Sequence, residues 1–309
     1  MSEREAERRI KRARRPFPAA NLDLSRLRLS EIPGELWACT RLRKLSLDRN
    51  SLTELPKRVG RLTALESLHL KANQLTELPF HIGNLANLRV LNLTANDLTE
   101  LPPEIGKLTN LERLVVRSNR LTSLPAEIGA LSNLKVLNVS DNQLTDLPPQ
   151  LGQLSNLRVL DLRGNELAAL PAELGELSEL TRIDVGDNQL TTLPPELGAL
   201  DNLTSLQVDR NALTELPSEL GHVRNLEAVL LQGNRLTQLP PQLGQLARLQ
   251  ILRLDANELT EVPPQLGALT NLETLDLTEN PGLDVPDAVL DGRPADVLRH
   301  VIDHSSSSA

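Results

Sequence analysis

Short runs in which leucine alternates with polar residues recur along most of the chain. In residues 42–50, for example, Leu45 and Leu47 stand between polar neighbours. An alternation with a period of two places one side of an extended chain in a core and the other side in water. Each run therefore predicts a short β-strand with one buried and one exposed side.

The runs recur every 23 residues without an insertion or deletion. An asparagine marks the period, at Asn50, Asn73, Asn96, Asn119, Asn142, Asn165, Asn188, Asn211, Asn234, Asn257 and Asn280. Prolines at the same spacing run from Pro33 to Pro286, which extends the series to twelve repeats. A fixed period of this length is typical of a solenoid. We therefore expect twelve stacked coils whose strands are parallel and about 4.8 Å apart.

The recurring residues predict the geometry of each coil. A buried asparagine offers one acceptor and two donors, so we expect it to pair backbone groups where the chain leaves each strand. Each proline favours extended backbone. Glycines such as Gly60 and Gly83 let neighbouring turns approach closely. The side opposite the strands is therefore predicted to be extended or 3₁₀ rather than long α-helix.

Residues 1–18 precede the first coil and predict a helix. Its acidic residues lead and Arg8–Arg15 follow, an order that suits the helix dipole. One face of the helix carries Ala6, Ile10 and Ala13. We interpret this segment as a cap over the first coil, the alternative being a nuclear-targeting or RNA-binding basic run.

The repeats are expected to occupy residues 19–293, with a second cap after them. Pro294 can begin a helix over residues 294–304. Its apolar stripe would cover the last coil and consists of Val297, Leu298, Val301 and Ile302. Residues 305–309, mostly serine, are predicted to be disordered.

Charge and composition narrow the class of protein. The net charge is −8 and the pI about 5.3, which argues against a nucleic-acid-binding body. The sequence has no stretch apolar enough to cross a bilayer. The single thiol, Cys39, excludes an internal disulfide. We expect a cytoplasmic protein that binds neither nucleic acid nor membrane.

The segment Leu101–Leu108, Leu-Pro-Pro-Glu-Ile-Gly-Lys-Leu, resembles the 23-residue class of intracellular leucine-rich repeats. That class includes Ras-pathway scaffolds, plant intracellular Ras-group proteins, Scribble-type polarity proteins and the repeats of Roco proteins. The resemblance covers about residues 19–290, and the exit segment after Asn280 is similar to bacterial members. It implies an α/β fold, a right-handed horseshoe-shaped solenoid with its parallel sheet on the concave face, and a protein partner such as a small GTPase or a signalling enzyme. No phosphate-binding loop accompanies it, so GTPase activity does not carry over.

The predicted partner site lies on the concave face, at the exposed strand positions of coils four to seven. A small apolar strip is bordered there by arginines, a composition typical of interface cores. The candidate residues are Val90, Asn92, Arg113, Val115, Arg117, Val136, Asn138, Val159, Asp161 and Arg163. The alternative is that valine suits any exposed strand position and that charges drift on a solvated face.

Two further features of the concave face accompany this site. His69 and Lys71 are expected to extend its basic side, and the downstream coils are expected to be acidic through Asp161, Asp184, Asp209, Asp255 and Asp276. A second apolar strip comprises Ala228, Leu230 and Ile251 beside Gln232 and Arg253.

Catalytic and metal sites are weakly indicated. The run from His300 to His304 has metal-ligand spacing but no evident third ligand. Asp161 and Asp184 resemble a glycosidase pair, yet arginines stand beside them and an open sheet has no pocket to exclude water. Cys39 has no histidine that can be placed beside it. We therefore predict no catalytic residue, no metal and no cofactor.

The sequence as a whole predicts a non-enzymatic, monomeric scaffold for protein–protein interaction in intracellular signalling, without a small-molecule substrate. Its stiffness would let it bind with little loss of conformational entropy. Two alternatives stay open. One is a regulatory subunit of a separate GTPase or kinase, and the other is a secreted effector that acts on a host protein.

Overall fold

The computed structural model describes residues 2–14, 20–283, 285–290 and 292–305. The chain forms two compact units. Unit 1 consists of Met1–Leu144 with Gln153–Leu157, and unit 2 of Thr145–Gly152 with Arg158–Ala309. In each unit, three-residue strands alternate with five-residue 3₁₀ segments.

Unit 1 begins with the helix α1, Ser2–Ala13. Its strands are β1 (Asn21–Asp23), β2 (Lys44–Ser46), β3 (Ser67–His69), β4 (Val90–Asn92), β5 (Arg113–Val115) and β6 (Val136–Asn138). Its 3₁₀ segments are η1 (Gly34–Ala38), η2 (Lys57–Arg61), η3 (Phe80–Asn84), η4 (Pro103–Lys107) and η5 (Ala126–Ala130). Each strand pairs in parallel with the next, in a register shifted by 23 residues, as in Leu91↔Leu114.

Unit 2 follows the same plan. Its strands are β7 (Val159–Asp161), β8 (Arg182–Asp184), β9 (Ser205–Gln207), β10 (Ala228–Leu230), β11 (Ile251–Arg253) and β12 (Thr274–Asp276). Its 3₁₀ segments are η7 (Ala172–Glu176), η8 (Pro195–Ala199), η9 (Ser218–His222), η10 (Pro241–Gln245) and η11 (Pro264–Ala268), while η6 (Pro149–Gln153) has residues of both units. The unit ends with the helices α2 (Asp287–Leu290) and α3 (Pro294–Ser305). These strands are also parallel and paired in chain order.

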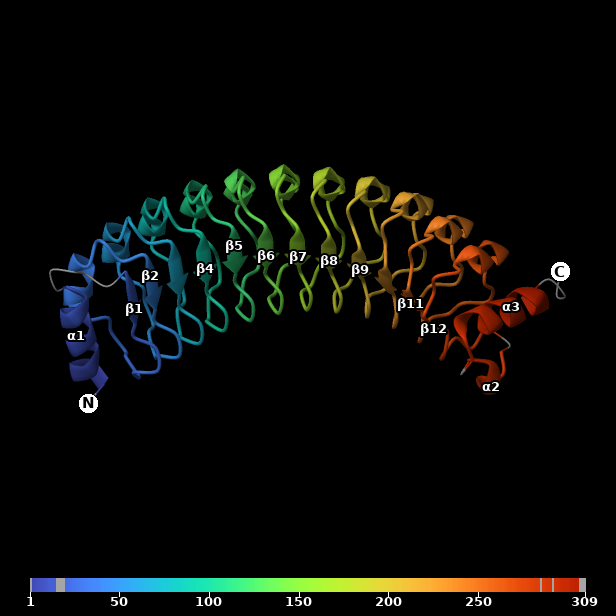
Figure 1. Cartoon of the computed structure of the whole chain (residues 1–309), viewed down its shortest axis with the longest axis horizontal. Coiled ribbons are helices and arrows are strands. Elements are labelled where there is room, and N and C mark those ends of the chain that lie inside the picture. Colours follow the sequence, from blue (N-terminus) through green and yellow to red (C-terminus); the bar gives the residue numbers. More distant parts are fainter. Residues whose placement is uncertain (1, 15–19, 284, 291, 306–309) are drawn as a thin grey trace. The chain divides into compact units, whose positions relative to one another are not determined.

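The predicted fold is therefore confirmed: parallel strands, 3₁₀ connections instead of long helices, and helices at both termini. In Figure 1 the strands of each unit lie on one side of the coils and the 3₁₀ segments on the other. We call these sides the strand face and the 3₁₀ side. Leucine, isoleucine and valine fill the space between them and are almost completely buried.

The recurring asparagine pairs backbone groups in the way that the sequence predicts. Asn96 is 7% exposed. Its Oδ1 accepts a hydrogen bond from the Leu75 amide at 3.0 Å, and its Nδ2 donates to the carbonyls of Leu70 and Leu93 at 3.0 and 2.9 Å. The same three bonds occur at Asn73, Asn119 and Asn234. Each side chain thus fastens its own coil to the preceding one.

The 3₁₀ side is held by proline and glycine. The proline before each segment, such as Pro102 with φ −68° and ψ 145°, keeps the chain extended until the turn begins. The glycine within the segment permits close stacking, since a Cβ on Gly83 would lie 2.8 Å from the Glu104 carbonyl oxygen. A side chain there would force neighbouring coils of unit 1 apart.

Helices lie at the two termini. In unit 1, α1 contacts β1 and η1 and buries Ala6, Ile10 and Ala13. In unit 2, α3 contacts η11 and buries Val297 and Leu298. The short helix α2 was not predicted. Helix α3 extends to Ser305, one residue into the segment predicted to be disordered, and residues 306–309 lie outside the described part of the chain. None of the helices in the described residues is long and apolar enough to span a membrane.

The asparagine bonds predict an unequal response to two similar substitutions. Asn96→Ala leaves one amide and two carbonyls buried without partners, so we expect it to lower the free energy of unfolding by about 3 kcal/mol. Asn110→Ala removes one hydrogen bond, from an exposed side chain to the Ala86 carbonyl, and should cost about 0.5 kcal/mol. Urea unfolding monitored by circular dichroism measures both. Equal losses would contradict the structural role of Asn96.

Candidate protein-binding face

The register of β4, β5 and β6 brings seven of the ten predicted site residues together on the strand face of unit 1. Val90, Arg113 and Val136 form one row across the three strands, and Asn92, Val115 and Asn138 form the next. Arg117 follows two residues after β5 ends. The three valines are half-buried and both arginines are exposed. We call these seven residues the unit 1 strip.

The two asparagines of the unit 1 strip are held by their neighbours. Oδ1 of Asn92 accepts hydrogen bonds from the amide and the hydroxyl of Thr94, at 3.0 and 2.7 Å. Oδ1 of Asn138 accepts the same pair from Ser140, at 3.1 and 2.8 Å. These bonds occupy the acceptor atoms and fix the side chains. The strip therefore presents apolar surface and donors in a defined geometry.

Of the two arginines in the unit 1 strip, Arg113 is the one that forms no ion pair within the described residues. Arg117 is paired with Asp141, Nε to Oδ2 at 2.9 Å. Beside the strip, Glu112 forms ion pairs with Arg89 at 3.3 Å and Lys135 at 2.8 Å. The hydrogen bond from Lys135 lowers the pKa of Glu112, so this carboxylate stays ionised. Arg113, by contrast, makes no ion pair with any residue that the structure describes.

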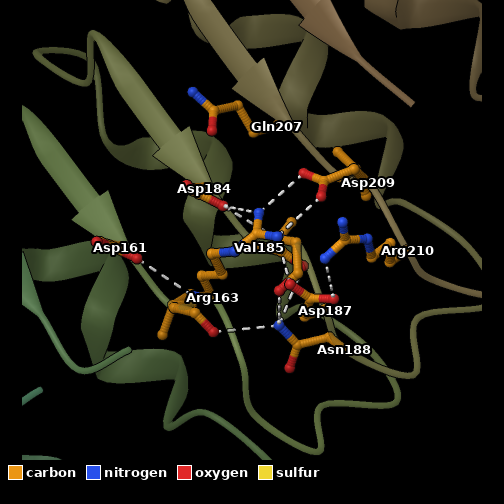
Figure 2. A network of polar contacts seen from close by, with 12 residues as sticks. Asp161, Arg163, Asp184, Val185, Asp187, Asn188, Gln207, Asp209 and Arg210 are labelled. Atoms are coloured by element: carbon orange, nitrogen blue, oxygen red, sulfur yellow. Dashed lines mark hydrogen bonds and ion pairs between the residues drawn. The ribbon is translucent and has the colours of Figure 1, made fainter. Parts of the chain in front are cut away.

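The other three predicted residues, Val159, Asp161 and Arg163, belong to unit 2, where Arg163 has an internal role (Figure 2). Its guanidinium donates to Asp209 at 3.0 and 3.1 Å, forms an ion pair with Asp187, and lies 3.9 Å from Asp184. The hydrogen bond to Asp209 raises the pKa of Arg163. Arg163 is thus the centre of an ion cluster within unit 2.

Gly186 makes this cluster possible. A Cβ at this position would lie 2.5 Å from Nη1 of Arg163 and 2.7 Å from Oδ1 of Asp209. The missing side chain therefore leaves the space through which Arg163 reaches an aspartate 46 residues further along the chain. Sequence analysis missed this contact, although a glycine at a strand-face position between coils rich in aspartate is the signal that indicates it.

The prediction of an acidic strand face downstream needs correction. Asp184 is 6% exposed and Asp209 is 4% exposed, and both are ion-paired with Arg163. Burial raises the pKa of Asp184. Upstream, burial lowers the pKa of His69, whose Nε2 lies 2.8 Å from the Ser67 hydroxyl, so the imidazole does not extend the basic side at neutral pH. The polarity along the strand face is weaker than the sequence predicts.

The second predicted strip lies on β10 and β11 of unit 2. Ala228 and Leu230 are half-buried, and Ile251 is 37% exposed. Gln232 is half-buried, and Arg253 lies 3.9 Å from Asp276. Ile251 is therefore the exposed apolar side chain of this strip, and the strip stays a prediction.

The sequence features that resemble catalytic or metal sites have other surroundings. Asp161 accepts a hydrogen bond from the Arg163 amide at 3.3 Å, and Asp184 is enclosed in the ion cluster. Cys39 is buried, which raises the pKa of its thiol. No group of three potential metal ligands occurs in the described residues, and the side chain of His304 lies outside them.

The ion cluster predicts a pH-dependent loss of stability. Arg163→Gln leaves the buried Asp209 without its cation and leaves Asp184 with Arg182 alone, at 3.8 Å. We expect it to lower the free energy of unfolding by about 2 kcal/mol at pH 7, less than for a fully buried pair because Arg163 is partly exposed. Arg210→Gln is the matched control, since Arg210 makes one exposed ion pair with Asp187 at 3.4 Å. Arg210→Gln should lower the free energy of unfolding by less than about 0.5 kcal/mol.

The difference in the free energy of unfolding between Arg163→Gln and wild type should become smaller as the pH falls. The pKa of Asp184 is raised by burial and lowered by Arg163, so removing the arginine raises it further. A carboxyl whose pKa is higher in the folded than in the unfolded state favours folding as it takes up its proton. Urea unfolding at pH 7 and at about pH 4.5 tests this. If the difference in the free energy of unfolding does not change with pH, the ion cluster is not its cause.

Comparisons with known proteins agree with this architecture. A model of a leucine-rich repeat region matches residues 80–157 and 147–229. A leucine rich repeat model matches residues 40–98 and 224–281. A search of curated protein sequences found no significant match.

Three solved structures illustrate the similarity. A leucine-rich-repeat protein of Leptospira interrogans is 32% identical, with a TM-score of 0.56 and coverage of 88% of this chain and 93% of that one. A TDR receptor is 33% identical, with a TM-score of 0.76 and coverage of 84% and 47%. The ectodomain of the plant membrane receptor kinase GASSHO1/SCHENGEN3 from Arabidopsis thaliana, in complex with Casparian strip integrity factor 2, is 29% identical, with a TM-score of 0.53 and coverage of 79% and 39%. This chain thus spans less than half of either receptor structure. Its matches to both models, over residues 40–281, and its identity to nearly the whole Leptospira protein show that it belongs to the leucine-rich-repeat family.

Proposed function

We propose that the protein is a non-enzymatic module that binds a protein partner on the strand face of unit 1, at the unit 1 strip. The observation that carries the proposal is Arg113, an exposed and uncompensated cation set between two half-buried valines. A desolvated arginine beside apolar side chains is the residue type that most often dominates an interface.

The chemistry of the strip favours a partner with a carboxylate next to an apolar side chain. The guanidinium of Arg113 offers a fork of donors that matches a carboxylate. The valines supply apolar area, and the fixed amides of Asn92 and Asn138 supply further polar contacts. Because the strand backbone is already ordered, little conformational entropy is lost on binding.

Val159, Asp161 and Arg163 are not part of this proposal. The guanidinium of Arg163 is engaged with Asp184, Asp187 and Asp209. Releasing it would leave buried carboxylates without a cation, which is unfavourable.

The role in the cell is also part of the proposal. We propose a cytoplasmic scaffold in signalling, of the kind found among intracellular 23-residue repeat proteins, with a partner such as a small GTPase or a signalling enzyme. The solved complex of the Arabidopsis receptor ectodomain with a protein factor supports protein binding by this fold. We also propose that the protein turns over no substrate, because Asp184 is ion-paired with Arg163 and the thiol of Cys39 is buried with a raised pKa.

The proposal predicts that one charge reversal weakens the binding of the partner. A photo-crosslinking amino acid at Val115 is expected to capture a partner from native lysate, which mass spectrometry then identifies. With that partner purified, Arg113→Glu should weaken the affinity at least tenfold, about 1.4 kcal/mol or more, in isothermal titration calorimetry.

Arg235→Glu is the matched control, because Arg235 is exposed on unit 2 and also makes no ion pair with any described residue. It should leave the affinity unchanged. If the captured protein binds Arg113→Glu as tightly as wild type, the unit 1 strip is not its site.

A further inference from the structure

The 3₁₀ side of unit 1 departs from the repeat at two adjacent segments, η2 and η3. In nine of the eleven 3₁₀ segments that the structure describes, the first residue is Gly, Ala, Ser or Pro and the second is Glu or Gln. In η2 these positions are Lys57 and Arg58, and in η3 they are Phe80 and His81. The repeats serve as an internal reference for what the fold needs at each position.

The structural positions of η2 and η3 follow the repeat. Val59 and Ile82 are fully buried, as the equivalent residues of the other segments are, and Gly60 and Gly83 keep the close stacking. The departures therefore leave the buried positions unchanged and affect three exposed side chains, Lys57, Arg58 and Phe80, and the half-buried His81. They place Lys57 and Arg58 in η2, and Phe80 and His81 in η3, where the other segments have a small residue or proline followed by Glu or Gln. Arginine and aromatic residues are enriched at protein interfaces, and glutamate is depleted there.

Phe80 is the most exposed large apolar side chain of the described residues, at 62%. One face of its ring stacks on the His81 ring, with centroids 3.9 Å apart and the planes inclined by 28°. This contact restrains the phenyl ring while most of its surface faces solvent. A restrained, exposed aromatic is suited to anchor a partner because little side-chain entropy remains to be lost.

A groove lies next to the residue that precedes Phe80 in the chain. It has a volume of about 590 Å³, and its apolar lining comes from Ile32, Trp37, Leu55, Pro56 and Pro79, the last directly preceding Phe80. Trp37 and Phe80 are two of the three aromatic residues in the sequence. An apolar groove beside an exposed aromatic offers a partner both a ridge and a hollow.

The cations of η2 give the surface its charge. Lys57, Arg58 and Arg61 are exposed, and none makes an ion pair within the described parts of the chain. Lys57 and Arg58 also line the groove, together with Glu54 and Glu77. The charged lining of the groove thus consists of two cations of η2 and two carboxylates that precede η2 and η3, an arrangement that would fix the direction of an occupant.

We propose that η2 and η3 form a second docking surface, for an extended acidic segment of a protein partner. Its carboxylates pair with Lys57, Arg58 and Arg61, and an apolar side chain beside them occupies the groove against Phe80. Charge complementarity and the aromatic ridge carry this assignment. It is independent of the unit 1 strip, which lies on the strand face and shares no residue with it.

The test uses a random dodecapeptide library displayed on phage, selected on the full-length protein. We expect the selected peptides to be enriched in Asp and Glu next to an aromatic or aliphatic residue. A synthetic peptide of the consensus sequence then gives affinities by fluorescence polarisation, which should weaken as NaCl is raised.

Two double variants restore the repeat consensus and so avoid a folding defect. Lys57→Ala with Arg58→Glu, and Phe80→Ala with His81→Glu, reproduce the Ala-Glu pair that the chain itself has at Ala126–Glu127 and Ala172–Glu173. Each should keep the wild-type unfolding midpoint and bind the peptide at least tenfold more weakly. Arg113→Glu, on the strand face, should bind it as wild type does.

Several results would overturn the proposal: no enrichment over the unselected library, selected peptides without acidic residues, or double variants that bind the consensus peptide as tightly as wild type does. Phosphatidylserine vesicles and a single-stranded oligonucleotide are assayed in parallel. Binding of either that depends on the same four residues, without peptide binding, would assign the surface to a lipid or nucleic-acid polyanion instead. If Arg113→Glu weakens peptide binding and the two double variants do not, acidic peptides bind on the strand face. That result would contradict the docking surface at η2 and η3 without contradicting the proposed function.

Discussion

The side-chain amide of the ladder asparagine is the interaction on which the structure of each unit depends. Through Asn96, for example, one side chain satisfies an amide and two carbonyls that would otherwise be buried without partners. Two of the three bonds reach the preceding coil, so the spacing of 23 residues cannot change locally without breaking them. This constraint fixes strand register and, with it, which side chains meet on the strand face.

The strand register also gives the charged side chains of the two units different surroundings. In unit 1 it places Arg113 between valines, where no carboxylate of the described residues reaches it. In unit 2 it brings Asp184 and Asp209 within reach of the Arg163 guanidinium (Figure 2), which occupies the space that a side chain on Gly186 would fill. Charged residues of similar appearance in the sequence therefore serve stability in one unit and are available for binding in the other.

The sequence predicted the features that recur in every coil. It predicted few of the contacts that depend on the conformation of individual side chains. Asn96, Pro102 and Gly83 have one role per coil, so their spacing alone indicates strands, extended entry and close stacking. The ion pair of Arg163 with Asp209 spans two coils and requires a missing Cβ at Gly186, which periodicity does not encode. The protonation of His69 depends on its burial between strands, which a count of charges ignores. The departures at Phe80 and Arg58 were readable from the repeats, but only once the outward positions of the 3₁₀ segments were compared with one another.

Because the sequence has few aromatic residues, the exposure of Phe80 calls for an explanation. In the described residues the core is built almost entirely from leucine, isoleucine and valine, and the aromatic side chain that it buries is Trp37, at 4% exposed. Burying a phenylalanine side chain is worth about 2 kcal/mol, and at Phe80 most of this gain is unused in the free protein. The small residues and prolines at the equivalent positions of other coils show that the fold accepts less apolar surface there. Since folding does not account for the exposed ring, association with another molecule is the process in which its hydrophobic free energy is realised.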